Sequence, residues 1–146
     1  MYDPIDPVDL TRVDSAGLVT LIAEATRAEN SAAGTRMAAV AELLTRHQAD
    51  DDPRWVIDAH AATTADVGAA MGISPRRAAT VVNTAEALRD RLPRIAERLR
   101  AGDISERVAK VMCFRTHLVN ESAAAAVDNA LAPRLPTAPE RCRTAR

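Results

Sequence analysis

The chain has 146 residues, of which 47% are hydrophobic, 27% are charged and only 2% are aromatic. This length suits one modest domain, and at this size about two thirds of the unfolded chain's surface can be buried without a metal or a disulfide. Few aromatic residues argue against an all-β sandwich or barrel, whereas alanine, about a fifth of the chain, is the best helix former. The composition therefore predicts an all-α protein.

The net charge of -1 hides an uneven distribution. Residues 1–66 carry twelve acidic and five basic side chains, whereas residues 67–146 carry eight acidic and fourteen basic ones. A basic second half permits a surface for nucleic acid or an acidic partner. A solvated helix bundle shows similar charges, so this distribution does not require such a partner.

Cellular location follows from the cysteines and the first residues. Cys113 and Cys142 form neither a disulfide framework nor a CxxC pair for zinc. The opening MYDPIDPVDL lacks the basic and apolar regions of a signal peptide, and no apolar run approaches the length of a membrane span. We therefore expect a cytoplasmic protein with no membrane partner.

The first third of the chain reads as an arm followed by a long helix. Residues 1–13 alternate Asp and Pro with single apolar residues and are expected to form a disordered arm. Asp14 or Ser15 can cap a helix that ends before Asp50, and the weak helix formers at 30–34 leave one long helix as the first choice and two helices as the second. Its apolar residues recur at helical spacing in two groups: Leu18, Leu21, Ile22 and Ala25, then Met37, Val40, Ala41 and Leu44.

Proline, glycine and capping residues divide the remainder into shorter helices. After a loop at 50–53 and a core anchor at Trp55, we expect helices from Thr64 to Met71 and from Pro75 to about Asp90. A further helix opens at Pro93 and closes at Gly102, another is capped by Ser105, and a last one begins at Asn120 or Ser122 and stops at Pro133. In the helix after Ser105, the side chains expected to face the core are those of Val108, Val111, Met112 and Leu118. Residues 14–135 thus form one helical domain, with an irregular tail at 136–146.

Residues 64–83, TADVGAAMGISPRRAATVVN, resemble a helix-turn-helix. Gly68 supplies the small residue needed where the second helix crosses the first, and Gly72 supplies the positive φ of the turn. Apolar residues fill the angle between the helices at Val67, Met71, Ile73, Ala78 and Val81. Many helical bundles that never touch DNA contain a similar corner, so a purely structural corner remains the alternative.

A helical wheel divides the second helix into two faces. The apolar face collects Ala78, Val81, Val82, Ala85, Leu88 and Leu92. The opposite face offers groups that bind phosphates and base edges in the major groove. We therefore predict a contact to double-stranded DNA by Arg76, Arg77, Thr80 and Asn83, with further phosphate contacts from Arg89, Arg91 and Arg94.

No arrangement of residues indicates catalysis, a cofactor or a small-molecule substrate. Cys113 and His117 lie one helical turn apart, but no second pair completes a metal site, so a buried thiol near a surface histidine is the preferred interpretation. His47 suits the end of a helix, and Asp58 with His60 has no nucleophile nearby. The sequence lacks a calcium loop and a phosphate-binding glycine loop. We expect no enzyme activity, no metal and no cofactor.

The segment MGISPRRAATVVNTAEALRDRLPRIAERLRAGDISERVAKVM resembles the actinobacterial "thirteen-E-twelve" repeat family, whose N-terminal part is the "domain of unknown function two-two-two". The resemblance covers roughly residues 10–132. Its matching motifs are GIS-x-R-x-A from Gly72, LRDRLP from Leu88, AGDIS from Ala101, RTHLV from Arg115 and the D-x-AL of Asp128, Ala130 and Leu131, together with Trp55 and Asp58.

Longer members of that family commonly continue into an HNH endonuclease domain, and nothing after Leu131 resembles one. The resemblance therefore implies the non-catalytic N-terminal module of an HNH-associated protein, cut short by truncation or a frameshift. Our leading hypothesis is a DNA-contacting module. The alternatives are a structural module that forms a homodimer through the long N-terminal helix, disrupted by substitutions at Leu18 or Leu44, and a truncated remnant without activity.

Overall fold

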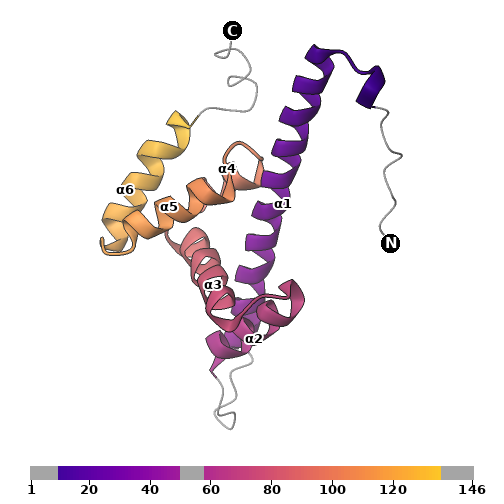
Figure 1. The fold of residues 1–146 in the computed structure, drawn as a ribbon. Helices are drawn as coiled ribbons and strands as arrows, with labels where there is room; N and C mark the ends of the chain where they lie inside the picture. The colour runs from indigo at the N-terminus through magenta and orange to yellow at the C-terminus, as the bar shows by residue number, and fades with distance from the viewer. Residues whose placement is uncertain (1–9, 50–57, 136–146) are drawn as a thin grey trace.

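A computed structural model of the chain describes residues 10–49 and 58–135, and over these residues all regular elements are helices (Figure 1). Between a short 3₁₀ helix η1 and a second one, η2, lie six α-helices. In chain order the elements are η1 (Leu10–Arg12), α1 (Ser15–Ala49), α2 (Ala59–Met71), α3 (Pro75–Asp90), α4 (Pro93–Arg100), α5 (Glu106–Thr116), α6 (Glu121–Leu131) and η2 (Ala132–Arg134). The predicted all-α class and the long N-terminal helix are confirmed.

The long helix α1 is continuous, as the first-choice prediction has it. The carboxylate of Asp14 accepts a hydrogen bond of 2.8 Å from the backbone N–H of Gly17 and so caps the helix. The two apolar groups have different environments. The second group is buried in the core, where Leu44 has no exposed surface, but Val19, Leu21 and Ile22 in the first half are exposed. Periodicity alone did not distinguish these two environments.

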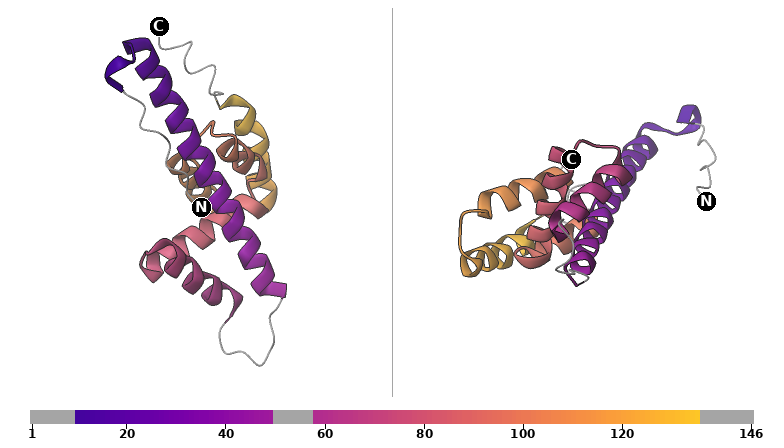
Figure 2. Two further views of the ribbon diagram at one scale, coloured as in Figure 1. Left: turned by 90° about the vertical axis from the view of Figure 1, so that its right-hand side faces the viewer. Right: turned by 90° about the horizontal axis from the view of Figure 1, so that it is seen from below.

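Helix α3 lies at the centre of the fold, packed against α1, α2, α4 and α5 (Figures 1 and 2). Its apolar face is buried as the helical wheel predicts, and Val82 and Leu88 meet Met37 and Leu44 of α1 in one core. Leu92, Ile95 and Leu99 extend this core into α4. Burial of these side chains, at about 25 cal/mol per Å² of apolar surface, is the main force that holds α3 with one face inward.

Both ends of α4 are capped by side chains from other helices. At its N-terminus the buried carboxylate of Asp128 in α6 accepts hydrogen bonds of 2.9 Å from the backbone N–H groups of Arg94 and Ile95. At its C-terminus, side chains of α1 donate to backbone carbonyls: Arg27 to Ala101, Asn30 to Gly102 and Ser31 to Arg100. These contacts satisfy groups that a short helix leaves unpaired, and they tie α4 to α1 and α6.

Most predicted helix ends are confirmed, but two expectations are wrong. Helix α2 begins at Ala59 rather than at Thr64, because the Asp58 carboxylate accepts a hydrogen bond of 2.7 Å from the Ala61 N–H and caps it five residues earlier. Helix α5 is turned differently from the prediction. Ala109 and Thr116 are its buried residues, Met112 is half-buried, and Val108, Val111 and Leu118 are exposed.

Several sequence predictions fall outside the described residues. These are most of the predicted arm, the loop at 50–53, the Trp55 anchor and the tail at 136–146. Within the arm, the described part at Leu10–Arg12 forms a 3₁₀ helix, contrary to the expectation of no stable structure there. Over the described ranges, no helix combines the length and apolar character of a membrane-crossing segment.

Candidate nucleic-acid interface

The corner between α2 and α3 is built by Gly72, as predicted. Gly72 has φ of 62° and ψ of 36°, a left-handed conformation that residues with a side chain rarely adopt. The N–H of Gly72 donates to the carbonyl of Ala69, and the N–H of Ile73 donates to the carbonyl of Gly68. These two bonds close α2 and turn the chain, and Ser74 with Pro75 then starts α3.

The two helices of this corner cross where α2 carries Gly68. A methyl group at Gly68 would lie 3.5 Å from the carbonyl oxygen of Ile73 and 3.6 Å from the Cβ of Ala78, both ordinary contact distances. The sequence argument for a small residue is therefore confirmed, and alanine would also fit. The buried Val67 and Ala78 fill the angle between the helices.

The first turns of α3 carry the predicted cations toward solvent. Arg76 and Arg77 are exposed, and neither guanidinium group has a hydrogen bond or an ion pair with any described residue. Thr80 is also exposed, and its hydroxyl donates to the carbonyl of Arg76. Asn83 lies further along this face, where its Oδ1 is 2.8 Å from Nε2 of His60. The structure thus places these four predicted residues together on the outer face of α3.

The three arginines predicted to bind phosphates lie elsewhere. Arg89 makes two hydrogen bonds to Asp90, of 2.6 and 2.8 Å, and donates to the Ala41 carbonyl and the Thr45 hydroxyl of α1. The hydrogen bond between Arg89 and Asp90 raises the pKa of the guanidinium and lowers that of the carboxyl. Through these bonds the Arg89 side chain joins α3 to α1.

Arg91 and Arg94 differ from each other as well. The Arg91 guanidinium donates to the carbonyls of Thr116, His117 and Val119, at and beyond the C-terminus of α5. The side chain of Arg94 is exposed, and its backbone N–H is the one that bonds Asp128. Only Arg94 among the three thus has an exposed side chain, and it lies on α4, beyond the end of α3.

A groove of about 780 Å³ lies between α3 and α5, beside the predicted contact face. Its floor is apolar, with Met71, Ile73, Val81 and Val111, and Phe114 lies along it. Its cationic residues are Arg36, Arg77, Arg107 and Lys110. Phe114 is not among the predicted contact residues, although Arg107, Lys110 and Phe114 at i, i+3 and i+7 share one face of α5.

One carboxylate, that of Glu106, partly offsets the cations of this groove. Glu106 pairs with Arg36 and with Lys110 at 2.6 Å each. Burial raises the pKa of Glu106, but hydrogen bonding to Lys110 and the charges of Lys110 and Arg36 outweigh it and leave the pKa below its usual value. Glu106 is therefore ionised at neutral pH, and the groove keeps a positive balance through Arg77 and Arg107.

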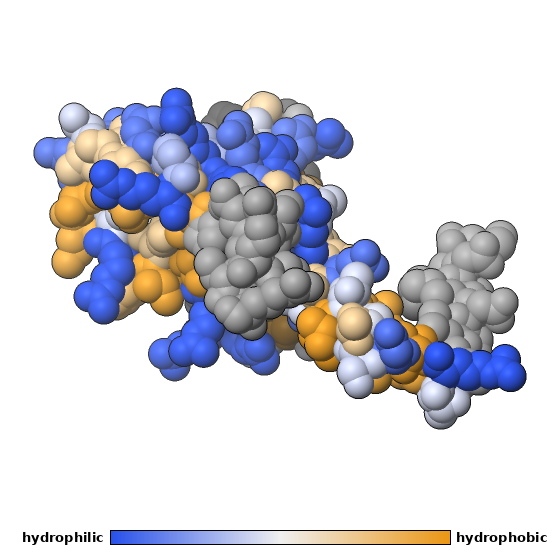
Figure 3. Space-filling model, turned by 90° about the horizontal axis from the view of Figure 1, so that it is seen from above, coloured by the Kyte–Doolittle hydropathy of each residue, from blue (hydrophilic) through white to orange (hydrophobic). Residues whose placement is uncertain are grey.

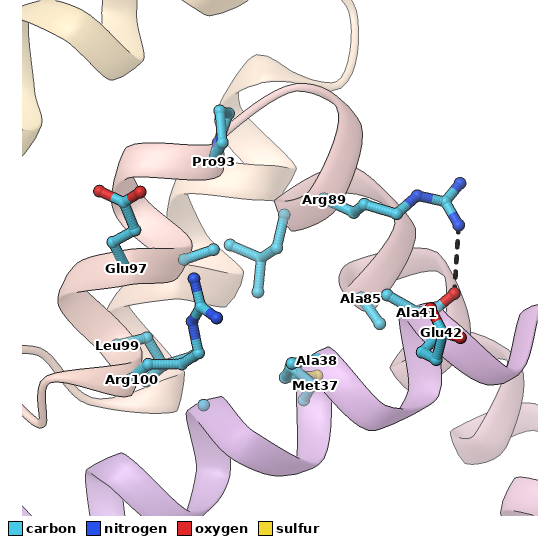
Figure 4. Close-up of a pocket in the computed structure, with 13 residues that line it drawn as sticks. Met37, Ala38, Ala41, Glu42, Ala85, Arg89, Pro93, Glu97, Leu99 and Arg100 are labelled. Carbon is cyan, nitrogen blue, oxygen red and sulfur yellow. Dashed lines mark hydrogen bonds between the residues drawn. The ribbon is translucent and has the colours of Figure 1, made fainter. Parts of the chain in front are cut away.

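A smaller cavity of about 300 Å³ lies between α1, α3 and α4 (Figure 4). Apolar side chains such as Met37, Ala85 and Leu99 line it. Figure 4 shows Glu97, Arg100 and Glu42 around it, with Arg89 bonded to the carbonyl of Ala41. Because two acids and two bases border the cavity, its charge favours neither an anionic nor a cationic ligand.

The described residues contain no cluster of three or more His, Cys, Asp or Glu side chains suited to a metal ion. Cys113 is half-buried, and burial raises the pKa of its thiol to about 11, whereas His117 is exposed. Each of the other two histidines bonds a nearby side chain: Nδ1 of His47 lies 2.8 Å from the Thr63 hydroxyl, and His60 bonds Asn83. The Asp58 carboxylate serves as a helix cap.

Comparison with known proteins identifies longer relatives. The chain is 36% identical over 129 residues to "Uncharacterized protein in est 3'region" of Mycobacterium tuberculosis, covering 87% of this chain and 37% of that relative. The same identity over the same length relates it to "Uncharacterized protein Rv3776" of Mycobacterium tuberculosis (strain ATCC 25618 / H37Rv), of which it covers 25%. The chain thus spans well under half of these relatives.

No solved structure matches the chain. The profile of one family matches residues 24–145, and the chain therefore belongs to that family, the "Domain of unknown function (DUF222)".

Proposed function

We propose that this chain is a double-stranded-DNA-contacting module that places the outer face of α3 in the major groove. The observation that carries the proposal is the state of Arg76 and Arg77, which are exposed and unpaired among the described residues at the first turns of α3. Recognition helices contact base edges with residues near their N-termini. The buried opposite face holds α3 in one rotation about its axis, so these side chains point outward in a defined direction.

Within this proposal the predicted residues take different roles. Arg76 and Arg77 bind base edges or phosphates directly, and Thr80 and Asn83 extend the contact along the same face. Arg107 and Lys110 of the neighbouring α5, across the protein groove between α3 and α5, supply phosphate contacts. Arg89 and Arg91 support the interface indirectly, because their bonds to α1 and to the end of α5 hold the surrounding helices in place.

The proposal is tested by titrating a labelled duplex at about 50 and about 200 mM salt, where phosphate contacts make affinity strongly salt-dependent. Arg76→Ala combined with Arg77→Ala is expected to weaken binding by about tenfold or more, and to reduce the slope of log affinity against log salt by about two if both arginines contact phosphates. The charge-matched control is Arg46→Ala with Arg134→Ala, two exposed arginines on α1 and η2 outside the corner.

Two results would remove the proposal. One is no measurable binding of the unmodified chain to duplex at low salt. The other is an equal loss of affinity in the control variant, because binding would then follow total charge rather than the surface of α3. Circular dichroism of each variant excludes loss of fold as the cause.

The resemblance to HNH-associated proteins suggests a context for such a module. In this proposal the chain holds DNA and does not cut it, and cleavage in longer proteins of the family belongs to a separate nuclease domain. Supercoiled plasmid incubated with the chain and a divalent metal is therefore expected to stay intact. Nicking that increases with protein concentration and persists through purification would show a catalytic role instead.

A further inference from the structure

The first half of α1 projects beyond the other described helices (Figure 1). Buried residues of α1 begin only at Ala33, and its hydrogen bonds to α4 and the following turn come from Arg27, Asn30 and Ser31. The apolar side chains before these positions are nevertheless large: Val19 is 64% exposed and Ile22 is 65% exposed. Figure 3 shows apolar residues at this end of the molecule, over η1 and the first turns of α1.

Apolar residues along this part of α1 recur in a regular order; Leu18 among them is half-buried. Leu18, Leu21, Ala25, Ala28 and Ala32 follow one another at alternating steps of three and four, which is the spacing of a coiled-coil seam. We call these five residues the Leu–Ala stripe. At about 100° per residue, the stripe lies roughly 150° around α1 from the face that carries Met37, Ala41 and Leu44 into the core. The stripe is therefore not a continuation of the core face.

The side of α1 that carries the stripe is open to a partner. Figure 2 (left) shows α1 in front of the other helices along its length. Leu21 is 36% exposed, and Ala25, Ala28 and Ala32 are all exposed. Nothing in the described residues covers them.

When two copies of the stripe run in opposite directions, large side chains of one copy lie opposite small side chains of the other. In an antiparallel pair of stripes, Leu18 of each copy lies opposite Ala28 of the other, and Leu21 lies opposite Ala25. The four layers formed by Leu18, Leu21, Ala25 and Ala28 then each join one large and one small residue, and Ala32 lies beyond the paired layers. A parallel pair would instead place leucine on leucine at one end and alanine on alanine at the other, so the helices could not keep one separation.

We propose that the Leu–Ala stripe is a docking site for a second copy of this chain, in antiparallel orientation. An isologous two-fold contact requires a surface that complements itself, and the alternation of leucine and alanine meets that requirement. Ile22 flanks the stripe next to Leu21, near the two-fold axis, where it meets Ile22 of the second copy. This inference is independent of DNA binding, since α3 lies on the other side of the core.

The size of the contact sets the strength of the dimer. From Leu18 to Ala28 the helix rises about 15 Å, which with a helix about 10 Å wide covers a strip of roughly 150 Å² in projection. A stable interface buries about 800 Å² of accessible surface on each partner. The pair is therefore weak, with a dissociation constant in the micromolar range, and its population depends on protein concentration.

The first test is sedimentation equilibrium of the full chain over a wide concentration range. Ala25→Glu is expected to raise the dissociation constant by about tenfold or more, because it places an unpaired carboxylate in the central Leu–Ala layers. Glutamate is a good helix former, so α1 persists. The matched control is Thr20→Glu, which adds the same charge to an exposed position on another face of the same helix and leaves the dissociation constant within about twofold.

The second test determines orientation. In a background with Cys113→Ala and Cys142→Ala, proteins carrying Leu18→Cys and Ala28→Cys are mixed and oxidised gently. The antiparallel pair predicts a disulfide between the two different variants in preference to Leu18→Cys joined to itself. A monomer at every concentration overturns the inference, as does a preference for the Leu18→Cys homodimer. A dimer that Ala25→Glu leaves intact and Phe114→Ser dissolves overturns it too, because α5 would then be the interface.

Discussion

Replacing Gly34 by alanine tests the closest helix contact of the fold. Gly34 lies in the middle of α1, where the C-terminus of α4 crosses it. A methyl group there would lie 2.6 Å from the backbone N of Arg100, 2.7 Å from its Cα and 2.8 Å from the carbonyl carbon of Leu99. All three are backbone atoms, so no side chain can rotate away, and the two helices must separate.

The expected magnitude follows from two opposing effects. Alanine raises intrinsic helix propensity over glycine by about 1 kcal/mol. Overpacking of a tight contact costs about 1–3 kcal/mol or more, and separation of the helices also strains the bonds from Asn30 and Ser31 to the end of α4. We therefore expect a net loss of about 2 kcal/mol in the free energy of unfolding, or roughly 4–8 °C in Tm for a chain of this size.

The measurement is urea unfolding followed by circular dichroism, with a thermal melt alongside. Gly68→Ala is the matched control, since it makes the same change within a helix but meets neighbours only at 3.5 and 3.6 Å. It is expected to stabilise the protein by up to about 1 kcal/mol. A neutral or stabilising Gly34→Ala would refute the reasoning, because it would mean that α1 and α4 do not touch as the structure shows.

Three further predictions follow from other contacts. Asp128→Ala removes the cap of α4 and is expected to cost about 1–3 kcal/mol, and Asp128→Asn less, in the same urea assay; equal stability of all three proteins would contradict this. Arg91→Ala removes the hydrogen bonds to the end of α5 and is expected to speed amide hydrogen exchange in α5 and α6, whereas replacement of the exposed Arg94 by alanine is not. Identical exchange in the two variants would contradict this role of Arg91. Since burial raises the pKa of the Cys113 thiol to about 11, only about 0.1% is thiolate at about pH 8, so alkylation read by mass spectrometry stays slow until urea unfolds the chain; rapid alkylation of the folded chain would disprove it.

Local sequence signals located most of the helices because they act within a few residues. Pro75 and Pro93 open α3 and α4 at the predicted positions, and Gly72 and Gly102, both with positive φ, follow the ends of α2 and α4. The two faces of α3 were also predictable, since their pattern depends only on the period of the helix. The start of α2 was missed because Asp58 caps it six residues before the weaker signal at Thr64.

The candidate site was predictable only in part, for a related reason. Arg76 and Arg77 are unpaired, whereas Arg89 and Arg91 have the same side chain but bond partners at Thr45 and Thr116. These partners are 44 and 25 residues away along the chain. The wheel places Arg89 about 220° from Arg76, on the apolar side of α3, but the pattern of α3 could not show which distant residues Arg89 and Arg91 would meet.

The sequence by itself determined that the chain is helical, where most helices begin and end, and which side of α3 is apolar, because propensity, capping and periodicity are properties of neighbouring residues. The tertiary structure decided which apolar faces are covered. It buries Leu44 but leaves Ile22 and Phe114 exposed. It also places Gly34 at the close contact between α1 and α4, whereas the sequence shows Gly34 only as a residue of low helix propensity. That difference arises because burial and hydrogen-bond partners depend on which distant segments come together, and periodicity along one helix carries no information about them.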